Sequence, residues 1–273
     1  MDNMVVLAGI SVLVGFTGSL IGLGGAAILI PLLVLFGIPV KEAIASAMVV
    51  IIATSSGSAA SYVRDRIVNI KIAMFLEMFT ISGAIAGATI TTIISPVFLY
   101  FFFAAFLMTS FLRFAFRRKS IFIRQDRFSQ WLGLNGSYYD VARRQLITYQ
   151  VGRPLLGGAS MLVAGLAAGM LGIGAGAFKV TVMENILNIP TKVASTTSNF
   201  IIGMTALSGV SVYLFSGLLN LTLMAPMAIG ATVGSIIGGR LLNRIRDNYL
   251  RILFFIVVIY LIVQMLYKGI VAL

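Results

Sequence analysis

Two glycine-rich stretches decide the fold: GSLIGLGGAA at residues 18–27 and GMLGIGAGAF at residues 169–178. Each stretch interrupts an apolar run that is otherwise long enough for a membrane helix. No Lys-Ser or Lys-Thr pair follows the glycines, which excludes a nucleotide-binding phosphate loop. Close helix packing through small residues explains one such stretch equally well. Two copies at corresponding positions instead favour a pair of broken helices that share one site in the membrane.

Composition places the chain among polytopic membrane proteins. Of its 273 residues, 59% are hydrophobic and 10% are charged, whereas about 25% of the residues of a soluble domain are charged. The net charge is +12, but the basic residues gather in a few loops between apolar runs. This is the pattern of cytoplasmic loops beside anionic lipid rather than of a nucleic-acid-binding surface. The chain has no cysteine and no histidine, so no metal site and no cofactor are expected.

Apolar runs occur in two sets that are separated by a basic connection. They cover about 4–21, 26–36, 43–63, 72–94 and 97–116, and then about 155–171, 177–187, 193–215, 221–242 and 252–267. About 20 apolar residues cross a bilayer, so the short runs 26–36 and 177–187 are expected to be half-helices, and whether they cross fully stays open.

The predicted fold is therefore an all-α membrane protein with three parts. An N-terminal membrane repeat covers 1–116, a basic cytoplasmic connection covers 117–153, and a C-terminal membrane repeat covers 154–273. The connection contains Trp131, the only tryptophan. We interpret it as a solvated linker, with a surface helix or small lid as the alternative.

The two membrane parts are related by a shift of 151 residues. The shift maps Gly18 to Gly169, Gly25 to Gly176, Lys41 to Lys192, Thr54 to Thr205, Tyr62 to Tyr213, Gly83 to Gly234 and Gly87 to Gly238. Corresponding loops differ in charge: 64–71 is basic and 215–222 is uncharged, whereas 89–96 is uncharged and 240–251 is basic. By the positive-inside rule these loops face opposite sides, which predicts inverted repeats of about five membrane segments each, with both termini outside.

Inverted repeats with paired broken helices are typical of alternating-access transporters, which bind substrate near the bilayer midplane. The half-helices that start at about Gly25 and Gly176 present free N–H groups, which suit an anion. Hydroxyl and amide donors can replace the water shell of an oxyanion. The predicted substrate-binding residues are Gly22, Gly24, Gly25, Ser46, Thr54, Gly172, Gly174, Gly176, Lys179, Thr196, Thr197, Ser198 and Asn199.

Charged residues within the apolar runs supply the coupling candidates. Isolated charge in a membrane is costly and usually functional. Lys179 is expected to compensate substrate charge, and Glu184 is a candidate proton carrier or partner of a basic residue. Glu77 is either a coupling carboxylate or the partner of a loop arginine. Lys41 and Lys192, which follow matched Ile-Pro turns, are expected to anchor helix starts.

The run of Gly22 to Gly25, Pro31 and Gly37-Ile38-Pro39, followed by Gly172 to Gly176 and Ile189-Pro190, resembles the sulfite exporter TauE/SafE family. The resemblance implies a permease of the bacterial or archaeal inner membrane that moves sulfite, sulfonates or related anions, driven by the proton gradient. This sequence departs from the family's pattern at Ser46-Ala47, where Thr-Ser is expected, and at Val182, the counterpart of Pro31. The substrate can therefore differ from sulfite.

We predict a proton-coupled secondary transporter, an exporter or permease that works by alternating access, for a small sulfur-containing oxyanion such as sulfite or an organosulfonate. Its partners are that anion and the lipid bilayer. A passive anion channel and a transporter of another small organic anion are the alternatives. An intramembrane enzyme is disfavoured because the chain lacks histidine, cysteine and a clustered acidic pair. A membrane scaffold and self-association into a homo-oligomer stay open.

Overall fold

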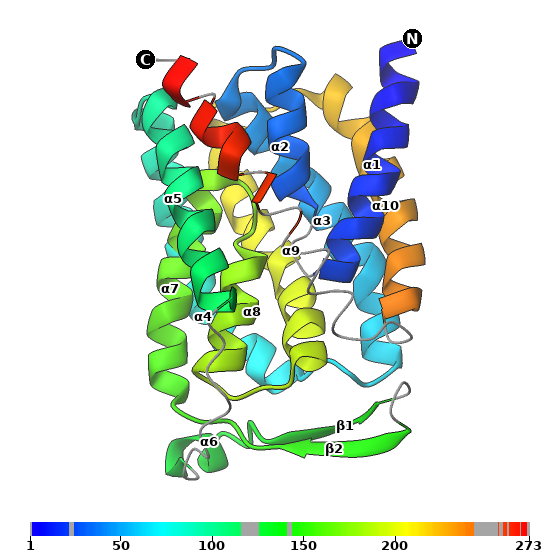
Figure 1. Ribbon diagram of the computed structural model, residues 1–273, viewed down its shortest axis with the longest axis vertical. Helices are drawn as coiled ribbons and strands as arrows, with labels where there is room; N and C mark the ends of the chain where they lie inside the picture. The colour runs from blue at the N-terminus through cyan, green and yellow to red at the C-terminus, as the bar shows by residue number, and fades with distance from the viewer. Residues whose placement is uncertain are drawn as a thin grey trace.

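The computed structural model describes residues 2–21, 25–115, 126–140, 144–242, 256, 259–260, 262–267 and 269–271. In chain order its first half comprises α1 (Asp2–Ile21), α2 (Ala26–Leu35), α3 (Val40–Arg64), α4 (Ile70–Ile93) and α5 (Pro96–Ala115). Its second half comprises α7 (Pro154–Leu171), α8 (Gly176–Asn185), α9 (Thr191–Phe215) and α10 (Leu221–Leu242). Figure 1 shows these helices side by side in one bundle.

The helices have the length and composition of membrane spans. Four of them, α3, α4, α7 and α9, are long and apolar enough to cross a bilayer, and shorter apolar helices cover Leu7–Leu20, Pro96–Phe106 and Ile262–Val271. The molecule is therefore a multi-pass helical membrane protein. The number of spans in each half stays a prediction.

Proline and asparagine set the starts of three long helices. Pro39 (φ −53°, ψ 138°) and Pro190 (φ −58°, ψ 142°) immediately precede α3 and α9. The Asn69 side chain accepts a hydrogen bond from the Ile72 amide (3.1 Å) and so caps the start of α4. Lys41 and Lys192 consequently lie in the first turns of α3 and α9. The Ile-Pro pairs before them predict this position at the helix starts.

Helices of one half pack against helices of the other half. The helix α1 packs along α10, α7 packs along α4, and α3 packs against α9. Glycines allow the close approach at two of these contacts. A Cβ atom at Gly83 or Gly87 of α4 would overlap the α7 backbone, and one at Gly234 or Gly238 would overlap α1. The four glycines form two pairs under the 151-residue shift, so the same positions make the corresponding contacts in both halves.

Gly165→Ala is expected to lower the free energy of unfolding by about 1–3 kcal/mol, because a Cβ at Gly165 of α7 would overlap the Thr80 carbonyl of α4. Thermal unfolding of the purified protein in detergent measures the change. Gly9→Ala in α1 is the control: a Cβ there meets nothing within 4 Å, so it gains only helix propensity. Equal unfolding temperatures for the two variants would contradict the close contact.

The connection between the halves is folded rather than a solvated linker. It contains the short helix α6 (Arg127–Trp131) and two antiparallel strands, β1 (Gly136–Asp140) and β2 (Gln145–Tyr149). The solvated-linker prediction is wrong for the described part because Leu134, Tyr138 and Asp140 are buried. The strands also make the molecule mostly rather than wholly helical. The surface-helix alternative is nearer the finding, since Trp131 lies on α6 and is 79% exposed. Residues 117–125 lie outside the described part.

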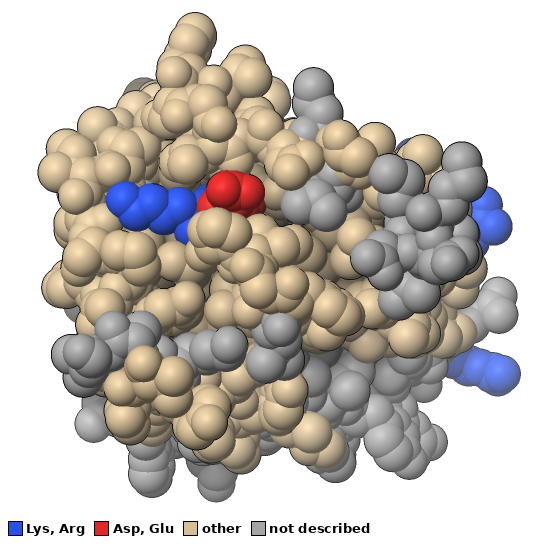
Figure 2. All heavy atoms as spheres, turned by 90° about the horizontal axis from the view of Figure 1, so that it is seen from above, with Lys and Arg blue, Asp and Glu red and all other residues tan. Residues whose placement is uncertain are grey.

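The hairpin and the N-terminus lie at opposite ends of the bundle (Figure 1). At the hairpin end the basic residues Lys71, Arg127, Arg144 and Arg153 are exposed. Figure 2 views the molecule from the other end, where the described surface is mostly uncharged, with small groups of basic and acidic atoms. Which side of the membrane the hairpin end faces stays a prediction.

Candidate functional site

Both glycine-rich stretches interrupt the helical backbone. The first helix, α1, ends at Ile21, and α2 begins at Ala26 after Gly25, whose φ is 79°. The second interruption separates α7 from α8 and contains Gly172, Gly174 and Ala175 with φ of 64°, 64° and 49°. Two helical breaks at these places were predicted. Gly22 and Gly24 lie outside the described residues.

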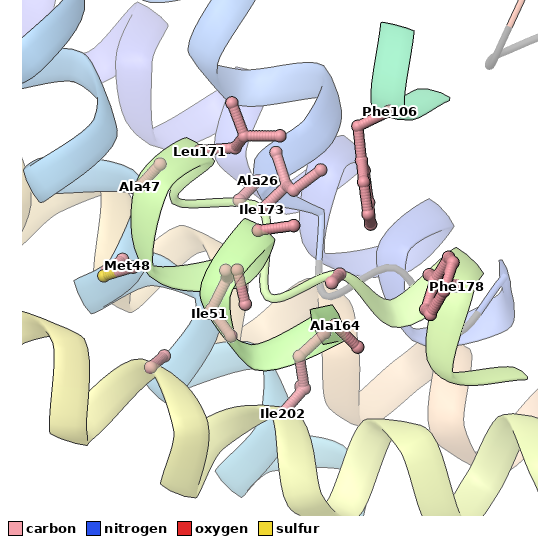
Figure 3. Packing of buried hydrophobic residues seen from close by; sticks show 14 of the residues in the cluster. Ala26, Ala47, Met48, Ile51, Phe106, Ala164, Leu171, Ile173, Phe178 and Ile202 are labelled. Carbon is pink, nitrogen blue, oxygen red and sulfur yellow. The ribbon is translucent and has the colours of Figure 1, made fainter. Parts of the chain in front are cut away.

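The second interruption lies between the long helices α3 and α9. A Cβ at Gly172 would approach Ile44 of α3, and one at Gly174 would approach Ile202 of α9. Leu171 and Ile173 belong to the same buried apolar cluster as Ile51 and Ile202 (Figure 3). The close surroundings of the two glycines are therefore apolar.

A buried chain of polar groups starts one turn into α8. Lys179, with 0% of its surface exposed, donates a hydrogen bond from Nζ to Oγ1 of Thr205 in α9 (2.6 Å). Thr205 in turn donates to Oε1 of Glu77 in α4 (2.7 Å), and Thr80 donates to Oε2 of the same carboxylate (2.5 Å). An ammonium group and a carboxylate, both buried, are thus joined through one hydroxyl.

Two roles were predicted for Glu77, and its contacts bear on both. Glu77 is 2% exposed, and within the part of the chain that the structure describes its partners are the two threonine hydroxyls and the charge of Lys179. A carboxylate and an ammonium inside a membrane protein stabilise one another, and removing either leaves a costly unpaired charge. Among the described residues the partner of Glu77 is therefore Lys179, and its role as a coupling carboxylate stays a prediction.

The polar chain joins the two halves and has no counterpart under the repeat. The shift of 151 residues places Thr54 opposite Thr205, Ile28 opposite Lys179 and Ala228 opposite Glu77. Thr54 Oγ1 donates to the Ile51 carbonyl of its own helix (2.9 Å). The two charged positions thus have apolar counterparts, and the repeat is asymmetric where its charges lie.

A second polar cluster joins Asn199 to the end of α1. Asn199 Nδ2 donates to the Ser19 carbonyl (2.7 Å) and to the Tyr62 hydroxyl (3.1 Å), and the Tyr62 hydroxyl donates to the same carbonyl (2.9 Å). Ser55 of α3 donates to the Asn199 carbonyl (2.6 Å). Ser19 is in the last turn of α1, whose carbonyls lack helical partners. Asn199 therefore ties the first interruption to α3 and α9.

The other predicted donors are scattered among local contacts. Thr196 Oγ1 donates to the Lys192 carbonyl of its own helix (2.9 Å). Thr197 Oγ1 accepts a hydrogen bond from the backbone amide of Asn69 (3.4 Å). Ser198 donates to the carbonyl of Gly176, the first residue of α8 (3.3 Å). Ser46 is buried, and in the described part of the chain its hydroxyl has no hydrogen-bond partner. Glu184 lies near the end of α8 and is half-buried.

The structure therefore brings Lys179 and Glu77 together and places Asn199 in a separate cluster. The linking residues Thr205, Thr80, Tyr62 and Ser55 were not in the predicted set. One sequence signal could have identified Thr205: it is the repeat counterpart of Thr54, which was predicted. Thr80 lies three residues after Glu77 and thus on the same helix face.

Comparison with known proteins gives a consistent result. Residues 7–265 match the family model described as Sulfite exporter TauE/SafE. The Probable membrane transporter protein YunE of Bacillus subtilis (strain 168) is 26% identical over 277 residues, which cover 98% of this chain and 99% of that protein. The Probable membrane transporter protein YdhB of the same organism is 26% identical, covering 85% of this chain and 87% of its own length. No solved structure matches the chain.

Proposed function

Because the chain belongs to the sulfite exporter TauE/SafE family, we propose that it is a proton-coupled secondary transporter of a small sulfur-containing oxyanion, such as sulfite or an organosulfonate. The family and the relatives indicate a membrane transporter rather than an enzyme. The proposal adds three finer statements: the substrate class, the coupling to protons, and alternating access through two inverted repeats.

The course of the helices supports the inverted repeats. In Figure 1, α1 begins at the end marked N, whereas its repeat counterpart α7 begins at the hairpin end. The helix α1 of the first half packs along α10 of the second, and their repeat counterparts α7 and α4 pack along one another in the same way. A pseudo-two-fold axis in the membrane plane produces such matched contacts. Two halves related in this way can rock about the contact between α3 and α9 and open each end in turn.

The Lys179–Thr205–Glu77 chain is the observation on which proton coupling rests. Lys179 lies in the first turn of the half-helix α8, where free N–H groups add positive potential. An oxyanion that binds Lys179 becomes its counter-ion and deprives the Glu77 carboxylate of the nearest positive charge. Glu77 then takes a proton, so one anion and one proton enter the site together. When the anion leaves, Glu77 releases the proton and again neutralises Lys179.

The topology that accompanies this mechanism places the connection 117–153 in the cytoplasm and the termini outside, in the inner membrane of a bacterium or archaeon. The exposed basic residues at the hairpin end support this orientation.

Transport by the purified protein in liposomes tests the proposal. We expect saturable uptake of at least one of sulfite, sulfoacetate, thiosulfate and taurine, and a pH gradient with the acid side outside the liposomes should raise the uptake. Counterflow, in which internal unlabelled anion speeds the entry of labelled anion, separates a carrier from a passive channel. Absence of both binding and uptake for all four compounds under either pH gradient would contradict the proposed substrate class.

A further inference from the structure

We infer that the described part of the connection, residues 126–140 and 144–153, is a latch that holds the hairpin end of the transporter closed in this conformation, and that the Asp140–Lys192 ion pair fastens it. The inference rests on the alternating access proposed above. It does not depend on which anion is carried. The following contacts carry it.

One side of the hairpin faces the bundle. Side chains alternate along β1, so Tyr138 and Asp140 are buried whereas Ser137 and Tyr139 are exposed. A carboxylate at an inward position is unusual, because a buried charge requires a partner. One partner of Asp140 is Lys192 in the first turn of α9, whose Nζ lies 2.7 Å from Asp140 Oδ1.

The ion pair is excluded from solvent. The side chain of Asp140 is 1% exposed and that of Lys192 is 3% exposed. Breaking a buried pair leaves two costly charges, unless the whole region opens and water reaches both. Such a contact has two stable arrangements, closed and dry or open and hydrated, rather than a continuum.

The same connection also binds the first half of the molecule. Asn69, at the start of α4, donates from Nδ2 to the Leu134 carbonyl (2.9 Å) and to the Tyr149 hydroxyl (3.0 Å). The ring of Phe75 in α4 meets the ring of Phe128 in α6 edge-on, with centroids 6.4 Å apart. Burial raises the pKa of the Tyr149 phenol, so this group stays neutral at physiological pH.

The connection thus bridges both halves at one end of the bundle. It reaches the first half through Asn69 and the second half through Lys192, and the Gly152 amide adds a hydrogen bond to the Leu187 carbonyl (3.1 Å). Halves that rock against one another must separate at the end that opens. The hairpin end therefore cannot open while these contacts hold.

At the opposite end of the bundle, the lysine that corresponds to Lys192 makes a weaker contact. Lys41 corresponds to Lys192 under the repeat, but its Nζ donates to the uncharged Thr92 carbonyl in the same half (3.1 Å). An ion pair to the connection is thus specific to the hairpin end. This difference biases the protein toward the conformation in which the hairpin end is closed.

Cysteine labelling tests the latch, since the chain has no native cysteine. One reporter is Val193→Cys, next to Lys192 and fully buried; the other is Val40→Cys, buried at the start of α3 at the opposite end. The protein is placed in lipid nanodiscs, where both faces meet water, and treated with a water-soluble maleimide. We expect Asp140→Asn to raise the labelling rate of the Val193 reporter by about tenfold or more and to lower that of the Val40 reporter.

Two controls and two opposing outcomes accompany the experiment. Gln145→Ala, at the exposed cross-strand neighbour of Asp140, and Lys41→Met should leave the Val193 reporter unchanged. An unchanged rate in Asp140→Asn overturns the latch, and faster labelling of both reporters overturns it in favour of general unfolding. Labelling needs no substrate, so the outcome is independent of whether sulfite-type anions prove to be the cargo.

Discussion

Glu77→Gln is expected to abolish the pH dependence of anion binding while the protein still folds. Glutamine keeps the size of the side chain, and its carbonyl can accept the hydrogen bond from Thr205. The negative charge beside Lys179 is lost, so an anion becomes the only counter-ion of that lysine. We therefore expect tighter binding than in the wild type at neutral pH.

The sign of the wild-type dependence follows from the linkage between anion and proton. An anion binds best when Glu77 is protonated, so the affinity rises as the pH falls through the range where Glu77 titrates. Uptake of one proton with each anion gives a limit of about tenfold in affinity per pH unit. In Glu77→Gln the affinity should be high and flat with pH, and a pH gradient should no longer drive accumulation, although counterflow persists.

Isothermal titration at several pH values measures binding, and flux into liposomes under a pH gradient measures coupling. Glu184→Gln is the matched comparison, because Glu184 is the other predicted coupling candidate and lies at the end of α8, away from the first turn that carries Lys179. It should retain the wild-type pH profile. If Glu77→Gln keeps both the pH slope and accumulation, the proton travels with another group and the assignment of Glu77 is wrong.

The positions of the helical breaks could be predicted from sequence because they depend on local chemistry. Glycine at 25, 172 and 174 adopts positive φ without steric penalty, and Pro39 and Pro190 mark the starts of α3 and α9. The repeat could be found as well, because a single shift keeps the glycines at the helix contacts in register.

The joining of Lys179 to Glu77 could not be predicted in this way. Thr205 and Glu77 are 128 positions apart, and only the packing of α9 against α4 brings them together. Their counterparts in the other half are Thr54 and Ala228, so repeat symmetry gives no hint of the contact. A buried carboxylate in a membrane helix predicts a partner, but the partner's identity depends on tertiary structure.

The hairpin was missed for a different reason. Its strands GSYYD and QLITY are five residues each. An alternation of polar and apolar residues over so few positions does not distinguish a strand from a loop. The cluster of arginines around them favoured a solvated loop. The inward Asp140 looked like an ordinary loop charge, because its partner Lys192 lies 52 positions away at a helix start.

Lys179→Met is expected to weaken anion binding by about tenfold to a hundredfold, the worth of a charge-assisted hydrogen bond of about 1.5–3 kcal/mol. Methionine has a similar length and fits an apolar environment, but it offers no charge and no donor. Transport should fall accordingly. Glu77 loses the ammonium that neutralises it through Thr205, so the single variant should also be less stable.

A second substitution separates binding from folding. In Lys179→Met with Glu77→Gln both charges are gone, and a neutral pair in a dry site is less costly than one unpaired carboxylate. The double variant should recover thermal stability relative to Lys179→Met yet remain unable to bind or move the anion. Lys41→Met, which removes a lysine bound to a backbone carbonyl, serves as the control for lost positive charge. If the double variant regains transport along with stability, Lys179 only balances Glu77 within the fold and the anion binds elsewhere.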